Sequence, residues 1–301
     1  YGYISPSDFN LFAKQAQLDI FDEYFLGYNS QINKENGRVS GTGYADITKG
    51  YEEVIDTFSI TGSLSKISNN TYSVPTTATT GSEYYLLNKV LIYSAVTSSG
   101  VTTGINGGNF LVDATATFQT DGVAIGDVVS VVIANSVVTN LSVVAVTNET
   151  SLEVNIASLT VDNLSYSIYK PVNLKNEAEL VHNSKITMLN KSMLTAPTIT
   201  YPAYNQEGSS LTLHPSTITS IGRVVSQYIR YPQDPKWTYV SITGGAPIFD
   251  QSQSDYQDFE LPIDDGNNLV ARILQYAGVS IREGDVYQFG RALEQQETQE
   301  Q

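Results

Sequence analysis

The sequence predicts an α+β protein in which helical segments from both ends of the chain form a body and a small antiparallel β barrel or sandwich is inserted between them. Apolar residues recur at helical spacing near both ends, whereas the middle is rich in Thr, Ser, Val and Gly and alternates with a period of two. The 301 residues, 41% of them hydrophobic, are enough for one large domain or a few smaller ones. We divide the chain into an N-terminal helical part (1–83), the β module (84–170) and the C-terminal part of the body (171–301).

The first helix has a strong start signal and two apolar stripes. Ser5-Pro6-Ser7-Asp8 supplies an N-cap serine, a proline at the first helical position and an acid three residues after the cap. At 100° per residue, one stripe contains Phe9, Phe12, Ala13, Ala16, Ile20 and Tyr24, and the opposite stripe contains Leu11, Leu18, Phe21 and Phe25. A helix on the surface of a monomer needs only one such stripe. We therefore expect this helix to lie between two layers, one of them a candidate second subunit, which indicates assembly rather than catalysis.

The helical part continues with a second helix. The first helix is predicted to end between Asn29 and Gly37, where Asn, Gly and Lys accumulate, and the second to cover 44–58. An exposed loop is predicted at 76–81, where threonines are followed by Gly81.

The β module is predicted from short alternating segments. Val112, Ala114, Ala116 and Phe118 alternate with polar residues, as in a half-buried strand. The dipeptides Asp121-Gly122 and Gly126-Asp127 indicate turns, and further strands are expected at 128–133, 137–146, 152–156 and 166–169. Such short strands favour a small barrel or sandwich.

The C-terminal part mixes helices and extended segments. A helix is predicted at 176–194, followed by extended segments around 211–215, 228–232 and 238–243. Asp264 or Asp265 can cap a helix that ends at Gly278. A last helix is expected at 281–295, followed by a solvated acidic tail at 294–301.

Composition excludes several function classes. The formal net charge is −15, with 16 basic and 31 acidic residues, so the chain has no basic patch for binding nucleic acid. An acidic wall would, however, let DNA pass without sticking. There are no cysteines, which excludes disulfides, thiolate metal sites and cysteine nucleophiles. No run of about 18 apolar residues could span a bilayer, so we expect a soluble protein with no membrane partner.

Candidate catalytic residues are few and form no recognisable motif. The two histidines, His182 and His214, belong to no metal-binding or triad-like pattern. The densest acidic cluster is not spaced to bring two carboxylates face to face, as a glycosidase needs; it contains Asp255, Asp258, Glu260, Asp264 and Asp265. The glycine-rich spots at 41–43 and 104–108 lack phosphate-binding spacing. We predict no catalytic residue, no cofactor and no metal.

Tyrosine is abundant, with 20 residues, and the single Trp237 lies in the densest aromatic region. That region also contains Tyr201, Tyr204, Tyr228, Tyr231 and Tyr239. Tyr and Trp are enriched at the centres of protein interfaces. Half or more of these residues are expected in ordinary cores, because aromatics dominate core packing as well. Stacking on sugars is the other use of such a surface.

Several segments resemble structural proteins of tailed phages, the nearest group being the crAss-like podoviruses and related phages of Bacteroidota. The resemblance covers both ends and the middle of the chain; its segments include Ser5-Pro6-Ser7-Asp8-Phe9-Asn10-Leu11-Phe12, Tyr228-Ile229-Arg230-Tyr231-Pro232-Gln233-Asp234-Pro235-Lys236-Trp237 and Ile273-Leu274-Gln275-Tyr276-Ala277-Gly278-Val279. The stretch from Leu111 to Phe118 also resembles small β domains inserted into phage structural proteins.

The resemblance implies a non-enzymatic virion protein: a cyclic ring, dodecameric or otherwise, in the head-to-tail connector or tail. Its implied partners are further copies of itself and other ring, portal or tail proteins, with genomic DNA passing through unbound and assembly in the host cytoplasm. The candidate subunit-interface residues are Phe9, Leu11, Phe12, Leu18, Ile20, Phe21, Phe25, Tyr228, Tyr231 and Trp237. One alternative is a carbohydrate-binding or adhesive module that uses the aromatics around Trp237. The other is a glycoside hydrolase that uses acids near Asp258.

Overall fold

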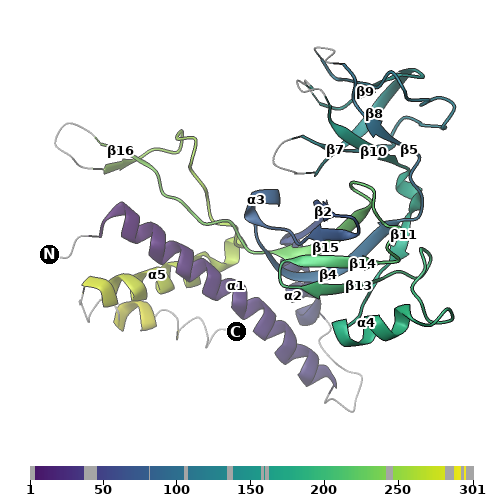
Figure 1. Ribbon diagram of the computed structural model, residues 1–301. Helices are drawn as coiled ribbons and strands as arrows, with labels where there is room; N and C mark the ends of the chain where they lie inside the picture. The colour runs from purple at the N-terminus through teal and green to yellow at the C-terminus, as the bar shows by residue number, and fades with distance from the viewer. Residues whose placement is uncertain are drawn as a thin grey trace. The chain divides into compact units, whose positions relative to one another are not determined.

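The chain folds into two compact units. The computed structural model describes residues 4–36, 46–80, 82–104, 108–133, 138–156, 159, 163–241, 247–281, 288–292 and 295. Unit 1 combines the two ends of the chain, Tyr1–Phe58 and Tyr231–Gln301, and unit 2 is Ser59–Arg230 (Figure 1). Helices lie near both termini and the sheets are almost entirely antiparallel, which confirms the predicted α+β class.

Unit 1 contains three main helices and one hairpin. Its elements are α1 (Pro6–Asn36), α2 (Asp46–Thr57), β16 (Tyr239–Ser241), β17 (Pro247–Phe249), the 3-10 turn η2 (Ile263–Asp265) and α5 (Gly266–Ile281). Residues 288–292 are also helical. Ser5 caps α1 as predicted, since its Oγ accepts a hydrogen bond from the Asp8 amide (3.2 Å) and donates one to the Asp8 carboxylate (2.7 Å).

Unit 2 contains three sheets. The four-stranded sheet has the order β1 (Ser59–Ser63), β15 (Val224–Arg230), β4 (Tyr84–Tyr93) and β11 (Leu174–Glu177). The five-stranded sheet has the order β12 (Glu179–Leu180), β13 (Ala203–Glu207), β14 (Ser210–His214), β3 (Thr71–Ser73) and β2 (Lys66–Ser68). The six-stranded sheet has the order β5 (Ser98–Val101), β10 (Ser165–Tyr169), β7 (Val128–Val132), β8 (Val138–Asn148), β9 (Ser151–Val154) and β6 (Phe110–Val112). Two short helices, α3 (Thr77–Thr80) and α4 (Asn183–Asn190), and the turn η1 (Pro171–Asn173) complete the unit.

The six-stranded sheet is the predicted β module and curls into a half-barrel. The chain after β5 meets β6 at the other end of the sheet, where the Thr103 amide donates to the Val112 carbonyl (2.9 Å). The apolar core inside includes Leu111, Phe118, Val129, Leu152 and Ile168, all fully buried. The predicted turns are present, with positive φ at Gly122 and Gly126.

Long-range strand pairing moves several predicted boundaries. The segment Tyr84–Tyr93 was predicted as the start of the β module, but it forms β4, which pairs with β15 and β11 of the four-stranded sheet. Residues 59–83 and 171–230, predicted as parts of the helical body, lie in unit 2 with the module. Pairing between strands this distant in sequence leaves no trace in local periodicity.

Three helix predictions also need correction. Only α4 forms within the predicted helix at 176–194, because the residues before it pair as strands β11 and β12. The predicted loop at 76–81 contains the short helix α3. Helix α5 runs past Gly278, which is buried, and Asp265 lies in the turn before the helix, where its carboxylate accepts a hydrogen bond from Tyr24.

Two predictions fall partly outside the described residues. Helix α2 is described from Asp46, and residues 37–45, which include the predicted start of this helix and the glycines at 41–43, are not described. Of the predicted last helix and tail, residue 281 belongs to α5, and residues 288–292 and 295 are described and helical.

The buried carboxylate of Asp113 stabilises the edge of the half-barrel through hydrogen bonds. Asp113, 1% exposed, accepts hydrogen bonds from the Thr115 amide (2.8 Å), the Thr115 hydroxyl (2.7 Å) and the Tyr166 hydroxyl (2.7 Å). A Cβ atom at Gly100 would lie 2.4 Å from Asp113 Oδ2 and 2.9 Å from the Tyr166 hydroxyl. The network therefore requires glycine at position 100.

Gly100→Ala should destabilise unit 2 by about 1–3 kcal/mol, since the methyl group must displace the buried carboxylate. Gly62→Ala in β1 is the matched control, because its nearest neighbour would be 3.9 Å from the new Cβ atom. Urea unfolding followed by circular dichroism measures both. Equal stabilities for the two variants would contradict the packing described above.

The Asp113 network also predicts a pH dependence. Burial alone would raise the pKa of Asp113, but the hydrogen bonds from Thr115 and Tyr166 outweigh burial and lower it below 3.8. The lowered pKa stabilises the folded state above the unfolded-state pKa, and this contribution is lost as pH falls through the folded-state pKa. The free energy of unfolding of wild type should therefore exceed that of Asp113→Asn by a constant amount above about pH 5, and this difference should decrease below about pH 4. A difference independent of pH would exclude this role for the carboxylate.

Candidate functional site

The C-terminal part of unit 1 lies on helix α1 and is bound to it by a network of hydrogen bonds. The side chain of Gln17 is 1% exposed; its Nε2 donates to the Gln233 carbonyl (2.7 Å) and its Oε1 accepts from the Glu260 amide (3.0 Å). The Glu260 carboxylate in turn accepts from the Gln233 amide (2.7 Å). Two extended stretches of the C-terminal segment are thus hydrogen-bonded to the same buried side-chain amide, that of Gln17.

Helix α5 lies along another side of α1. Tyr24 donates a hydrogen bond to the Asp265 carboxylate, Tyr276 donates to Asp19, and Arg272 forms an ion pair with Glu23. Burial and the neighbouring Asp265 carboxylate raise the pKa of Tyr24. This tyrosine therefore stays a hydrogen-bond donor.

The two predicted stripes of α1 meet different surroundings. Ile20 of the first stripe and Phe21 of the opposite stripe are both buried, at 1% and 0% exposure. Phe21 packs against the rings of Phe25, Phe58 and Tyr231, with centroids 5.1, 5.1 and 5.8 Å away. At Phe21 the layer that covers the opposite stripe therefore belongs to unit 1 itself and is not a second subunit. Leu11, by contrast, is 62% exposed.

The N-terminal half of α1 anchors Trp237. The Asn10 side chain accepts from the Trp237 amide (2.8 Å) and donates to the Trp237 carbonyl (3.3 Å), while the Phe9 ring meets the indole edge to face at 6.3 Å. Trp237 lies directly before the hairpin formed by β16 and β17, so Asn10 fixes the base of this hairpin.

The hairpin is apolar on both faces. On one face, Trp237 lies nearly parallel to the rings of Tyr239 (5.6 Å) and Phe249 (6.2 Å), which are paired across the strands. On the other face, Val240 is paired with Ile248. Tyr239, Val240, Ile248 and Phe249 are 44–51% exposed. Figure 1 shows the hairpin standing away from α1 and α5 of its own unit on extended chain.

The predicted interface residues thus separate into two groups. Ile20, Phe21 and Tyr228 are at most 1% exposed and cannot reach a second subunit. The others keep accessible surface: Phe9, Leu11, Phe12, Leu18, Phe25, Tyr231 and Trp237. The four hairpin residues were not among the predicted interface residues. The signal that could have found them is the segment 237–249, which contains no charged residue in a chain where 16% of residues are charged.

The predicted aromatic region is not one cluster. Tyr204 and Tyr228 are buried in unit 2, on β13 and β15 of different sheets, and Tyr201 is exposed on the same unit. Trp237, Tyr239 and Tyr231 belong to unit 1. Only the hairpin aromatics form an accessible group.

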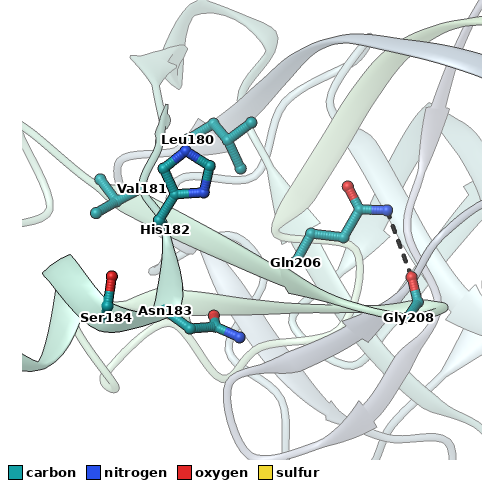
Figure 2. Close-up of a pocket in the computed structure, with 7 residues that line it drawn as sticks. All are labelled: Leu180, Val181, His182, Asn183, Ser184, Gln206 and Gly208. Atoms are coloured by element: carbon teal, nitrogen blue, oxygen red, sulfur yellow. Dashed lines mark hydrogen bonds between the residues drawn. The ribbon is translucent and has the colours of Figure 1, made fainter.

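An open pocket of about 630 Å³ in unit 2 contains one histidine (Figure 2). It is lined by the chain from Leu180 to Ser184, where β12 leads into α4, and by Gln206 and Gly208 of the facing turn. His182 is exposed, and the Gln206 amide donates to the Gly208 carbonyl (3.4 Å). No carboxylate lines the pocket, so it offers no acid–base pair for catalysis.

The second histidine has a structural environment. His214 lies between Asn205, whose Oδ1 is 2.9 Å from Nε2, and Asn190, whose Nδ2 is 3.2 Å from Nδ1. Burial lowers the pKa of His214. Two amides therefore hold a neutral ring, with Nε2 as donor.

The acidic cluster is divided among separate partners. Asp255 pairs with Lys236, Glu260 accepts from Gln233, and Asp265 accepts from Tyr24. Within the described ranges, no three His, Cys, Asp or Glu side chains come together in a way that could hold a metal ion. Asp255, Glu260 and Asp265 are therefore each engaged in a contact with a different residue of unit 1.

No protein-family model matches the chain, and no curated protein matches it significantly. Among the residues that the structure describes, no helix is both long and apolar enough to cross a membrane. The hairpin and the exposed side of α1 carry exposed apolar side chains and form the candidate site.

Asn10→Ala should release the base of the hairpin. The variant loses two hydrogen bonds to the Trp237 backbone, at a cost of about 1–2 kcal/mol, and leaves the indole more accessible to water. Because Trp237 is the only tryptophan, a red shift of intrinsic fluorescence in the folded protein reports the change. Gln15→Ala, an exposed α1 variant that loses only a bond to Asp19, should leave the emission unchanged. An unshifted spectrum for Asn10→Ala would refute the anchoring role.

Proposed function

We propose that the chain is a non-enzymatic structural protein of a tailed-phage virion that forms a cyclic ring in the head-to-tail connector or tail. The hairpin β16–β17 carries the assembly part of this proposal. A two-stranded hairpin is marginally stable in water on its own, and this one exposes apolar side chains on both faces. Exposed apolar groups of this kind mark interaction sites.

The surface of α1 supports the same interpretation. Leu11 and Leu26 are more than 60% exposed on a helix whose other side is already covered by its own unit. A cyclic ring requires heterologous contacts, in which one surface of a subunit meets a different surface of the next. A hairpin and a separate helix side meet this requirement better than one self-complementary patch does.

The assignment to a phage virion depends on the sequence resemblance described above. The charge of −15 is compatible with it, because an acidic ring would allow DNA to pass without adhering to the wall. Other ring, portal or tail proteins are the proposed axial partners.

The hairpin provides a direct test of assembly. Ile248→Asp places a charge on its apolar face and should shift the protein toward monomer, as measured by size-exclusion chromatography with light scattering over a range of concentrations. Ile125→Asp is the matched control, since Ile125 is exposed in a turn of unit 2; it should assemble like wild type. Electron microscopy of the wild-type oligomer should show closed rings. A wild-type protein that stays monomeric at high concentration without partners would overturn the proposal.

One observation favours a second function, the binding of carbohydrate by the three nearly parallel rings of Trp237, Tyr239 and Phe249. Glycan-array binding that is lost in a folded Trp237→Ala variant would favour this function over assembly.

A further inference from the structure

Unit 2 carries a second exposed apolar surface, on α4 and the turn that follows it. Met188 is 72% exposed, and Met193 and Leu194 are 103% and 94% exposed. The chain has only two methionines, so both lie in this short stretch and neither fills the core. Flexible, polarisable methionines are common at protein-binding surfaces. We name Met188, Met193 and Leu194, with Lys185 and Lys191, the α4 surface.

The α4 surface is basic in an acidic protein. Residues 180–206 contain Lys185 and Lys191 but no Asp or Glu. Both lysines are exposed, and neither forms an ion pair within the described part of the chain. Their charges are therefore available to an acidic partner.

The hairpin and the chain that follows it have the opposite charge. Residues 237–265 contain no Lys, Arg or His, and Lys236, which directly precedes this stretch, is paired with Asp255. Asp250 directly follows β17, and its amide bonds back to the Thr238 carbonyl (3.0 Å), so this carboxylate lies at the base of the hairpin. The acidic residues of this stretch are Asp250, Asp255, Asp258, Glu260, Asp264 and Asp265.

We propose that the hairpin of one copy docks on the α4 surface of a second copy, head to tail, an inference that depends on the ring assembly proposed above. The aromatic face of Trp237, Tyr239 and Phe249 meets the methionines, since sulfur packs favourably against aromatic rings. The acidic base of the hairpin meets Lys185 and Lys191, and this complementarity sets the orientation.

Charge explains why the hairpin is proposed to bind the α4 surface of the second copy and not the hairpin of that copy. Two hairpins placed together would bring two acidic bases into contact, and like charges across an interface oppose association. Because the hairpin and the α4 surface are different patches, the pair of copies keeps one hairpin and one α4 surface free after a single contact. The contact therefore propagates, and it gives a ring when the rotation between copies closes.

The absence of cysteine from the chain allows a specific cross-linking test. Met193→Cys and Phe249→Cys proteins, the second with its cysteine on the aromatic face of the hairpin, are prepared separately, one of them with a mass tag, then mixed at an assembling concentration and treated with a short bismaleimide. The mixed product should dominate over both homodimers. Replacing the Met193→Cys protein by an Ile125→Cys protein should abolish the mixed product.

Light scattering on the same samples separates the two proposals. Oligomers without the Met193–Phe249 cross-link would overturn the head-to-tail contact and leave the ring proposal standing. A monomeric protein would overturn the ring proposal and the contact with it. A protein that carries both cysteines in one chain is treated in the same way at high dilution. An intramolecular cross-link would show that the hairpin binds the α4 surface of its own chain, which also overturns the contact between copies.

The charge component has its own matched pair of variants. Lys191→Glu and Lys175→Glu change the net charge equally and at exposed positions, but only Lys191 belongs to the α4 surface. Lys191→Glu should weaken association more than Lys175→Glu, and the difference should shrink at high salt. Equal effects would contradict the proposed role of the α4 lysines.

Discussion

The buried amide of Gln17 is the constraint on which unit 1 depends. An unpaired buried amide costs several kcal/mol, and both ends of this one are satisfied only when Gln233 and Glu260 lie on α1 together. Two stretches of chain more than two hundred residues away are thereby held against one helix. Trp237 follows the stretch at Gln233 in the chain. Its backbone is bound by Asn10, which lies about two helical turns before Gln17 on α1. The hairpin is therefore positioned by polar contacts to α1, and its apolar side chains remain available for other contacts.

This arrangement separates the groups that stabilise unit 1 from the groups proposed to bind. Phe21, Phe58 and the tyrosine contacts between α1 and α5 stabilise the unit internally. The hairpin contributes little to that core, because its large side chains are about half exposed. In unit 2 the same division holds between buried Ile186 of α4 and the exposed Met188 on the same helix. Each unit thus keeps one apolar surface outside its core, and the two surfaces differ in charge.

Part of the candidate site could be predicted from the sequence. The start of α1 and the β module were expected from capping signals and periodicity, and the structure contains them. Tyr228 was expected at an interface because it lies in an aromatic segment, but strand β15 is central in its sheet and buries it. Gln17 belongs to neither apolar stripe, and its burial could not be foreseen, since its partners are far away in the sequence.

The sequence by itself determined the local features: where α1 begins, which segments alternate as strands, where Gly122 and Gly126 turn the chain, and that 237–249 is uncharged. These follow from backbone preferences and from residue types within a few positions of each other. Only the tertiary structure decided that Phe21 is covered, that β4 pairs with β15 and not with the strands of the β module, and that the hairpin is exposed. Covering a side chain requires a partner brought close by folding, and partners such as Tyr231 for Phe21 and β15 for β4 lie far away in the sequence.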